Sequence, residues 1–215
     1  LSGEPLAFLP GKVVCVGRNY AAHAEELSNP LPAKPLLFIK PATALAALEQ
    51  PLELPDYGGN CQHEVELAIL IGELLDRRSP TVEFQAIAGY ALALDLTLRQ
   101  LQTRLRAQGH PWEIAKAFDR SCPISQFVTP QQLGDVSDIH FQLEVNGELR
   151  QHGHSRRMLV GILPLLDYIR GFFSLCPGDV ILTGTPAGVG DLHPGDRLYL
   201  NLAGRFQFTT TVYRP

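Results

Sequence analysis

Two glutamates, Glu64 and Glu66, stand two residues apart in the otherwise apolar stretch from Gln62 to Ile71. If this stretch is a strand, residues two apart point to the same face, so the two carboxylates lie side by side. Neighbouring carboxylates in an apolar strand repel one another unless a cation, a proton or a basic side chain compensates. The alternative is an exposed strand face with both acids in solvent, and the apolar residues that follow make that interpretation less favourable.

A third acid, Asp95, falls within the run from Ala91 to Thr97, which otherwise has the composition of a buried strand. Buried acids without partners are rare. Three carboxylates, without a cysteine pair or a His-x-x-x-His spacing, predict a site for a hard divalent cation, Mg²⁺ or Mn²⁺, and fit calcium or zinc less well. Such an ion presents open positions to a chelating substrate such as a 2-oxo acid and polarises its carbonyl.

Two further groups could carry proton chemistry. His23 and Glu26 are three residues apart in a helix-like stretch from Asn19 to Leu27, for which Asn19 is the expected N-cap. Residues at this spacing share a helix face, so the carboxylate could orient the imidazole and raise its basicity. Taken alone, such a His–Glu pair is more often a solvated surface pair.

The composition limits the classes of protein that these residues can belong to. The 215 residues are 45% hydrophobic and 19% charged, with a net charge of −4. A chain of this length buries roughly 70% of its unfolded surface, which predicts one compact domain over residues 1–215. The small charge argues against a protein held mainly by nucleic-acid phosphates or by an anionic membrane. Glycine and proline, 19 and 17 residues, predict many short strands and tight turns.

Cysteine usage and the distribution of apolar residues address the compartment. The four cysteines are widely separated and form no Cys-x-x-Cys pair, which favours a reducing environment. No apolar run approaches the roughly 18 residues of a membrane span, and the N-terminus lacks the layout of a signal peptide. We therefore expect a cytoplasmic protein with no membrane or nucleic-acid partner.

Hydrophobic patterning supplies the elements that must position these residues. Predicted strands cover Lys12–Val16, Leu36–Ile39, Gln62–Ile71, Ala86–Leu96, Phe141–Val145, Val180–Leu182 and Arg197–Leu202. Predicted helices cover Asn19–Leu27, Thr97–Ala107 and Leu159–Phe173. Asn146-Gly147 is the preferred dipeptide of a type I′ hairpin turn. These elements predict a β-rich α+β domain with a few short helices.

Seven segments, in this order and spacing, carry a resemblance to a known family. They are Val16–His23, Phe38–Thr43, His63–Glu66, Gly89–Thr97, Trp112–Lys116, Val145–Glu148 and Gly178–Gly190. Together they resemble the fumarylacetoacetate hydrolase (FAH) family, most closely its small single-domain acylpyruvase and oxaloacetate decarboxylase-like members, over nearly the whole chain. The resemblance implies an FAH-type mixed β-roll or sandwich, a homodimer, and a divalent metal ion held by Glu64, Glu66 and Asp95.

The same resemblance implies roles for other residues. A lid segment, residues 17–35, would close over the substrate and bring His23 and Glu26 to a catalytic water, with Lys116 as a third catalytic residue. The residues matching substrate contacts of the family are Arg18, Tyr20, Arg99, Gln102 and Thr185. Two features depart from the family pattern: Gln100 replaces a common Asp, and the loop 152–158 is unusually basic, which suggests more anionic substrates.

These residues predict a metal-dependent hydrolase that cleaves a carbon–carbon bond in an acylpyruvate-like 2,4-dioxo acid. The same metal–enolate chemistry would serve an oxaloacetate decarboxylase, or a 2-hydroxyhepta-2,4-diene-1,7-dioate isomerase of aromatic catabolism. A catalytically silent oxo-acid-binding protein is the alternative from another class. The complete set of acids, His23, Glu26 and Lys116 argues against silence, because a protein without turnover is expected to lose part of such a set.

Overall fold

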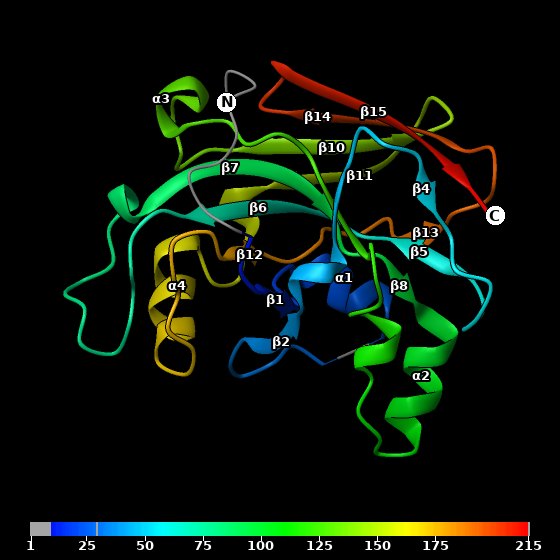
Figure 1. Ribbon diagram of the computed structural model, residues 1–215, viewed down its shortest axis with the longest axis horizontal. Helices are drawn as coiled ribbons and strands as arrows, with labels where there is room; N and C mark the ends of the chain where they lie inside the picture. Colours follow the sequence, from blue (N-terminus) through cyan, green and yellow to red (C-terminus); the bar gives the residue numbers. More distant parts are fainter. Residues whose placement is uncertain (1–9, 29, 215) are drawn as a thin grey trace.

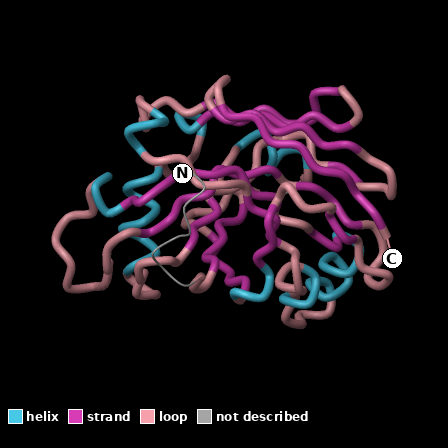
Figure 2. Tube along the Cα trace, turned by 45° about the horizontal axis from the view of Figure 1, so that its top comes forward, coloured by secondary structure: helices cyan, strands magenta, loops and turns pink. Residues whose placement is uncertain are grey.

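The computed structural model describes residues 10–28 and 30–214. Over these residues, strands form three sheets, and four short α-helices lie at their margins (Figures 1 and 2). This confirms the predicted β-rich α+β class. Within the same residues, every helix falls short of the length and hydrophobicity of a membrane span. The predicted single domain includes residues 1–9, 29 and 215, and the predicted lid segment includes residue 29. These residues lie outside the described part of the chain.

The largest sheet places two long strands at its centre. In order across the sheet its strands are β2 (Leu36–Lys40), β1 (Val13–Gly17), β12 (Val180–Leu182), β6 (Val65–Ile71), β7 (Ile87–Leu94), β9 (Cys122–Ile124) and β3 (Leu45–Ala47). Along β6, Val65, Leu67 and Ile69 join one buried cluster while Ala68 and Leu70 join another. Both faces of this strand are therefore packed, which is why its sequence is apolar throughout instead of alternating.

Two smaller sheets and the helices complete the fold. The five-stranded sheet has the order β11 (Glu148–His154), β10 (His140–Val145), β14 (Arg197–Leu202), β15 (Phe206–Tyr213) and β4 (Leu52–Glu53), and the three-stranded sheet β13 (Gly190–Asp191), β5 (Cys61–His63) and β8 (Thr97–Leu98). The α-helices are α1 (Ala21–Glu26), α2 (Arg99–Ala107), α3 (Pro130–Leu133) and α4 (Ile162–Arg170). The 3-10 helices are Ala42–Ala44, Phe84–Ala86, Glu113–Ala115 and Ser155–Arg157. Asn146 and Gly147 have φ of 55° and 82°, as the predicted type I′ turn requires.

The register of β6 and β7 gathers the acids at one end of the sheet. The two strands are antiparallel with Val65 opposite Leu94, so the next pair along is Glu64 and Asp95. The Asp95 amide donates to the Glu64 carbonyl at 2.8 Å. The predicted continuous strand from Gln62 to Ile71 is wrong in one respect, because it is interrupted at Glu64, between β5 and β6. This break still leaves Glu64 beside Glu66.

Asn19 does not cap the first helix, contrary to the prediction. The N-cap position is Tyr20, and it makes no side-chain cap hydrogen bond. The Asn19 amide instead donates to the carbonyls of Thr183 (2.9 Å) and Val160 (3.0 Å), and its Oδ1 accepts from the Val160 amide at 2.9 Å. Asn19 thus joins the start of α1 to two distant loops. The second predicted helix also begins two residues late, at Arg99, because Thr97 and Leu98 form β8.

Gly184, in the loop after β12, is expected to tolerate no side chain. Its φ is +101°, and a Cβ there would lie 2.7 Å from the Cβ of Asn19. Gly184→Ala should therefore lower the free energy of unfolding by about 1–3 kcal/mol, measured by urea denaturation. Gly161→Ala is the matched control, since a Cβ there meets nothing within 4 Å. Equal stability of the two variants would contradict the assignment of strain to Gly184.

Candidate active site

Three buried carboxylates converge where β6 and β7 meet the loop after β12. Glu64, Glu66 and Asp95 are 5%, 2% and 1% exposed. Each offers an oxygen, and these oxygens lie within 4.8 Å of one another. The structure therefore excludes the alternative of a solvated acidic strand face.

Three basic side chains accompany the acids. Lys116 Nζ donates to Glu64 Oε2 at 2.9 Å and to Asp95 Oδ2 at 2.5 Å, and Arg99 donates to Glu64 Oε1. Lys40 Nζ lies 2.9 Å from Asp95 Oδ1. That contact is a charge pair without hydrogen-bond geometry, because Lys40 directs its protons to the Lys116 carbonyl and to Ser121. Three cations thus match three carboxylates in number, but all of these contacts go to Glu64 and Asp95.

This uneven pairing separates the carboxyl groups by pKa. Burial alone would raise the pKa of Glu64, but Lys116 and Arg99 outweigh it and hold that pKa well below the ordinary value. The pKa of Glu66 is raised well above its ordinary value, first by burial and then by the neighbouring Asp95 and Glu64. Burial would lower the pKa of Lys116, but Asp95 and Glu64 raise it further, so this lysine stays charged. Glu66 is therefore the group that holds a proton unless another cation is close.

The donor set fits a hard divalent ion. Glu66 Oε2 accepts a hydrogen bond from the Gly184 amide at 2.5 Å, and no basic side chain among the described residues forms an ion pair with Glu66. Asp95 Oδ1 is buried without a hydrogen-bond donor. All three ligands are carboxylates, the oxygen donors that Mg²⁺ and Mn²⁺ prefer. Glu64, Glu66 and Asp95 can thus hold such an ion. The ion would place beside Glu66 the positive charge that no basic side chain of the described residues supplies.

The helix α1 lies against the loop that follows β12. His23 is buried, and its Nδ1 lies 3.2 Å from Glu26 Oε2, so the predicted pair forms. The other carboxylate oxygen, Glu26 Oε1, accepts a hydrogen bond from the Gly188 amide at 2.9 Å. Because Nδ1 faces Glu26, Nε2 is the nitrogen of His23 that is left for a ligand.

The carboxylates and His23 open onto a cavity of about 290 Å³. Its lining includes four of the five residues predicted to bind substrate, Arg18, Arg99, Gln102 and Thr185. Tyr20 is not among the lining residues; its side chain is buried, and its hydroxyl donates to the His154 carbonyl at 3.3 Å. The Thr185 hydroxyl donates to the Val65 carbonyl at 2.9 Å and accepts from the Gln151 amide at 2.8 Å, so at most one lone pair and its backbone are left to face a ligand.

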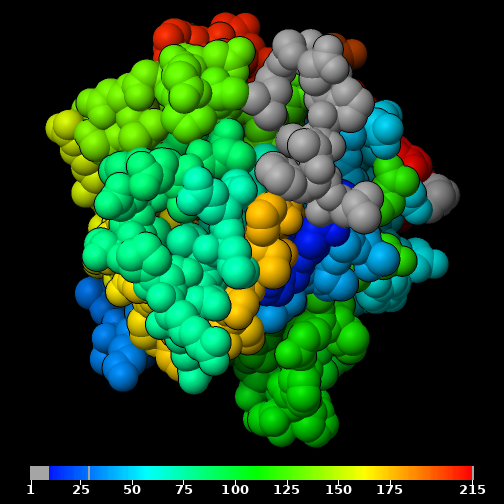
Figure 3. All heavy atoms as spheres, turned by 60° about the vertical axis from the view of Figure 1, so that its left-hand side comes forward, coloured from blue at the N-terminus to red at the C-terminus, as the bar shows by residue number. Residues whose placement is uncertain are grey.

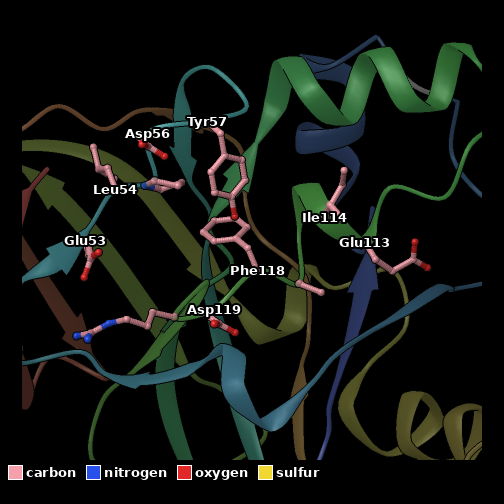
Figure 4. A pocket seen from close by; sticks show the side chains of 11 residues that line it. Glu53, Leu54, Asp56, Tyr57, Glu113, Ile114, Phe118 and Asp119 are labelled. Atoms are coloured by element: carbon pink, nitrogen blue, oxygen red, sulfur yellow. The ribbon is translucent and has the colours of Figure 1, made fainter. Parts of the chain in front are cut away.

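A second cavity, of about 570 Å³, lies near the segment that carries Lys116 (Figure 4). Tyr57 and Phe118 lie next to one another in its wall. Four of its lining residues are acidic: Glu53, Asp56, Glu113 and Asp119. Although it is larger, this cavity repels an anionic substrate, and the smaller one holds the convergent acids and bases.

Sequence reasoning missed three residues of the site. Lys40 lies at the end of β2 and is fully buried. The sequence feature that could have identified it is a lysine within a strongly apolar strand. Arg106, on α2, lines the cavity mouth. Gln151, on β11, accepts from the Val65 amide at 2.9 Å, lies 3.0 Å from His63 Nδ1 and donates to Thr185 Oγ1 at 2.8 Å. No local pattern marked Gln151, because its partners are more than thirty residues away.

Comparison with known proteins agrees with this geometry. The family model for the C-terminal part of fumarylacetoacetate (FAA) hydrolase matches residues 12–213. The chain belongs to the fumarylacetoacetate hydrolase family. An oxaloacetate tautomerase from Escherichia coli, YcgM, is 49% identical over 211 residues, which cover 98% of this chain and 96% of that protein. A tautomerase is an enzyme, so this relative agrees with the prediction that the chain is catalytic.

Two solved structures from the family show the range of its activities. Fumarylpyruvate hydrolase from Pseudomonas aeruginosa, in complex with Mn²⁺ and pyruvate, is 37% identical, with a TM-score of 0.92 over 99% of this chain and 94% of that chain. A 2-hydroxyhepta-2,4-diene-1,7-dioate isomerase from Mycobacterium marinum is 33% identical, with a TM-score of 0.81 over 97% of this chain and 77% of that chain. Relatives of this chain are thus named as a tautomerase, a hydrolase and an isomerase.

Lys40 is expected to stabilise the site from beneath. Lys40→Met removes the cation beside Asp95 and one of the two donors to the Lys116 carbonyl, which keeps the Ser121 hydroxyl at 2.8 Å. Breaking a buried charge pair in this way costs about 3–5 kcal/mol, to be measured as the free energy of unfolding in urea. Lys34→Met is the control, since Lys34 is exposed. A Lys40→Met variant as stable as this control would contradict the structural role of the buried lysine.

Proposed function

We propose that this protein is a divalent-metal-dependent oxaloacetate tautomerase, which interconverts the enol and keto forms of a dicarboxylic 2-oxo acid. The observation that carries the proposal is a cavity lined by three carboxylates that could hold a metal ion and by three arginines. The name of the E. coli relative supports the same substrate. The predicted ion is Mg²⁺ or Mn²⁺, and the Mn²⁺ and pyruvate in the P. aeruginosa relative support a metal-bound 2-oxo acid.

The charges of the cavity favour a dianion. Arg18, Arg99, Arg106 and Lys116 line it. Burial lowers the pKa of Arg18, and the nearby Arg106 lowers it further, so these two like charges lie close together at the mouth. Within residues 10–28 and 30–214, Arg106 forms no ion pair with an acidic side chain. The second carboxylate of a dicarboxylic substrate would relieve this repulsion, whereas the neutral acetyl group of acetylpyruvate would not.

The side chains divide the proton chemistry between them. Tautomerisation moves a proton between carbon 3 and the 2-oxo oxygen. The metal ion, when bound, supplies Lewis-acid polarisation of that oxygen. Lys116 holds a positive charge beside the position where negative charge develops. His23, oriented by Glu26 through Nδ1, presents Nε2 to take the proton from carbon 3 and to deliver it to the 2-oxo oxygen, and the reverse transfer regenerates the keto form.

Hydrolysis of an acylpyruvate is the second candidate, and the His23–Glu26 pair is the observation that favours it. A paired imidazole and carboxylate can deprotonate a water molecule as well as a carbon acid. The fumarylpyruvate hydrolase relative supports this reaction. Decarboxylation of oxaloacetate and isomerisation of a dienedioate use the same enolate and remain predictions, as do the homodimer and the substrate contact of Tyr20.

The two candidates separate in one set of assays. The decay of enol oxaloacetate and the cleavage of fumarylpyruvate and acetylpyruvate are each followed as a loss of ultraviolet absorbance. Each assay is run with Mg²⁺, with Mn²⁺, and after removal of metal by a chelator. We expect metal-dependent decay of the enol above the buffer rate. His23→Asn should slow that decay by about 10²–10⁴-fold, the usual contribution of a general acid–base group.

His110→Asn serves as the control, because His110 is an exposed histidine outside the cavity. Tautomerisation that is equal with and without metal would contradict the proposal. Cleavage of fumarylpyruvate with no acceleration of enol decay would favour the hydrolase instead.

A further inference from the structure

We infer that the chain carries a second metal site, for a borderline transition metal such as Zn²⁺, formed by Asp138, His140 and His154. One ligand atom from each of these residues lies within 4.8 Å of the others. This site shares no residue with the three carboxylates of the active-site cavity. It also does not depend on the proposed function.

The backbone of a hairpin brings the two histidines together. His140 begins β10 and His154 ends β11, and the antiparallel register places them directly opposite one another. Residues in such a pair project from the same face, with Cβ atoms roughly 5 Å apart. Their rings are stacked, with centroids 4.0 Å apart and planes 18° apart.

Asp138 is held next to this pair by the residues around it. The Ile139 amide donates to Ser155 Oγ at 2.9 Å, and the Ser155 amide donates to the Ile139 carbonyl at 2.9 Å. These two bonds fix the backbone on both sides of the cluster, so only the side chains have to turn for the three ligands to meet one ion. The cluster is half open to solvent, with side chains 52% exposed for His140 and 16% for His154. An ion can reach it from water.

Both Nε2 atoms approach the same carboxylate oxygen. His154 Nε2 is hydrogen-bonded to Asp138 Oδ1, and His140 Nε2 lies 3.6 Å from it. Two ligands of a tetrahedral ion, each about 2.1 Å from the metal, are roughly 3.4 Å apart. The His140 separation is close to that value, and His154 must withdraw slightly to admit the ion. Arg156 Nη2 lies 3.2 Å from the other oxygen, Oδ2, which leaves Oδ1 available.

The donor set determines the class of ion. Two imidazoles and one carboxylate suit Zn²⁺ and its neighbours, whereas Mg²⁺ prefers oxygen ligands alone. Three protein ligands leave one position for water. A bound ion would join the start of β10 to the end of β11, where the His154 carbonyl lies 3.3 Å from the hydroxyl of Tyr20 at the base of α1. The site thus lies next to the lid helix without entering the cavity.

The experiment uses the difference between hard and borderline ions. Zn²⁺ binding to the full chain is measured by equilibrium dialysis with excess Mg²⁺, which occupies the carboxylates. All proteins carry Cys176→Ser, because the exposed Cys176 thiol could bind Zn²⁺ itself. We expect one Zn²⁺ retained per chain, with affinity reduced about tenfold or more in His140→Asn and in His154→Asn.

His193→Asn is the matched control, because His193 is an exposed histidine near a single acid, Asp196, at 3.8 Å. It should bind Zn²⁺ as the parent protein does. Circular dichroism and Mg²⁺-dependent turnover should be unchanged in His140→Asn, since its side chain is mostly exposed. No Zn²⁺ retained in the presence of Mg²⁺, or equal affinity in His140→Asn, His154→Asn and His193→Asn, would overturn the inference.

Discussion

The burial of Glu66 without a basic partner is the constraint on which the site depends. Glu64 and Asp95 are neutralised by Lys116, Arg99 and Lys40, but within the part of the chain that the structure describes Glu66 receives only the Gly184 amide. A carboxylate in a dry site costs several kcal/mol unless it is compensated, so the group either holds a proton or meets a cation. Folding thus prepares a place in which a divalent ion replaces a proton.

The sheet makes this arrangement rigid. Glu64 and Asp95 are opposite one another because of the β6–β7 register, and a shift of one residue would turn both side chains to other faces. The β12 loop adds the amide of Gly184 on the other side of Glu66, and Asn19 fastens that loop to the base of α1. The three carboxylates, the helix α1 and the cavity are therefore one connected unit. In Figure 3, α2 projects from the body of the molecule. Its residues Arg99, Gln102 and Arg106 line the cavity.

The sequence could predict the acids because two of them violate the apolar pattern of their strands. Glu66 and Asp95 needed no alignment to be noticed, and their meeting followed once both runs were strands of one sheet. Asn19 was misjudged because Asn is a common N-cap, whereas its actual partners, Val160 and Thr183, are more than 140 residues away. Strand β15 had no counterpart among the predicted elements, since its threonines and glutamine gave no continuous apolar run.

Lys40 illustrates the remaining limit. Its position in an apolar strand was visible, but its role depends on contacts with Asp95, Lys116 and Ser121, which come from three other segments. Long-range pairings of this kind are set by topology, and a single sequence contains no local signal for them. The resemblance to the family supplied the order of the segments, and the structure supplied which of them touch.

The central claim is that a divalent ion displaces a proton from Glu66, and proton release on metal binding tests it most directly. Calorimetric titration with Mn²⁺ in two buffers of different ionisation enthalpy, at a series of mildly acidic to neutral pH values, should show proton release on ion binding. The proton release should fall as the pH rises through the raised pKa of Glu66, and Glu66→Gln should release none. Tight Mn²⁺ binding by the unaltered protein without proton release would contradict the account.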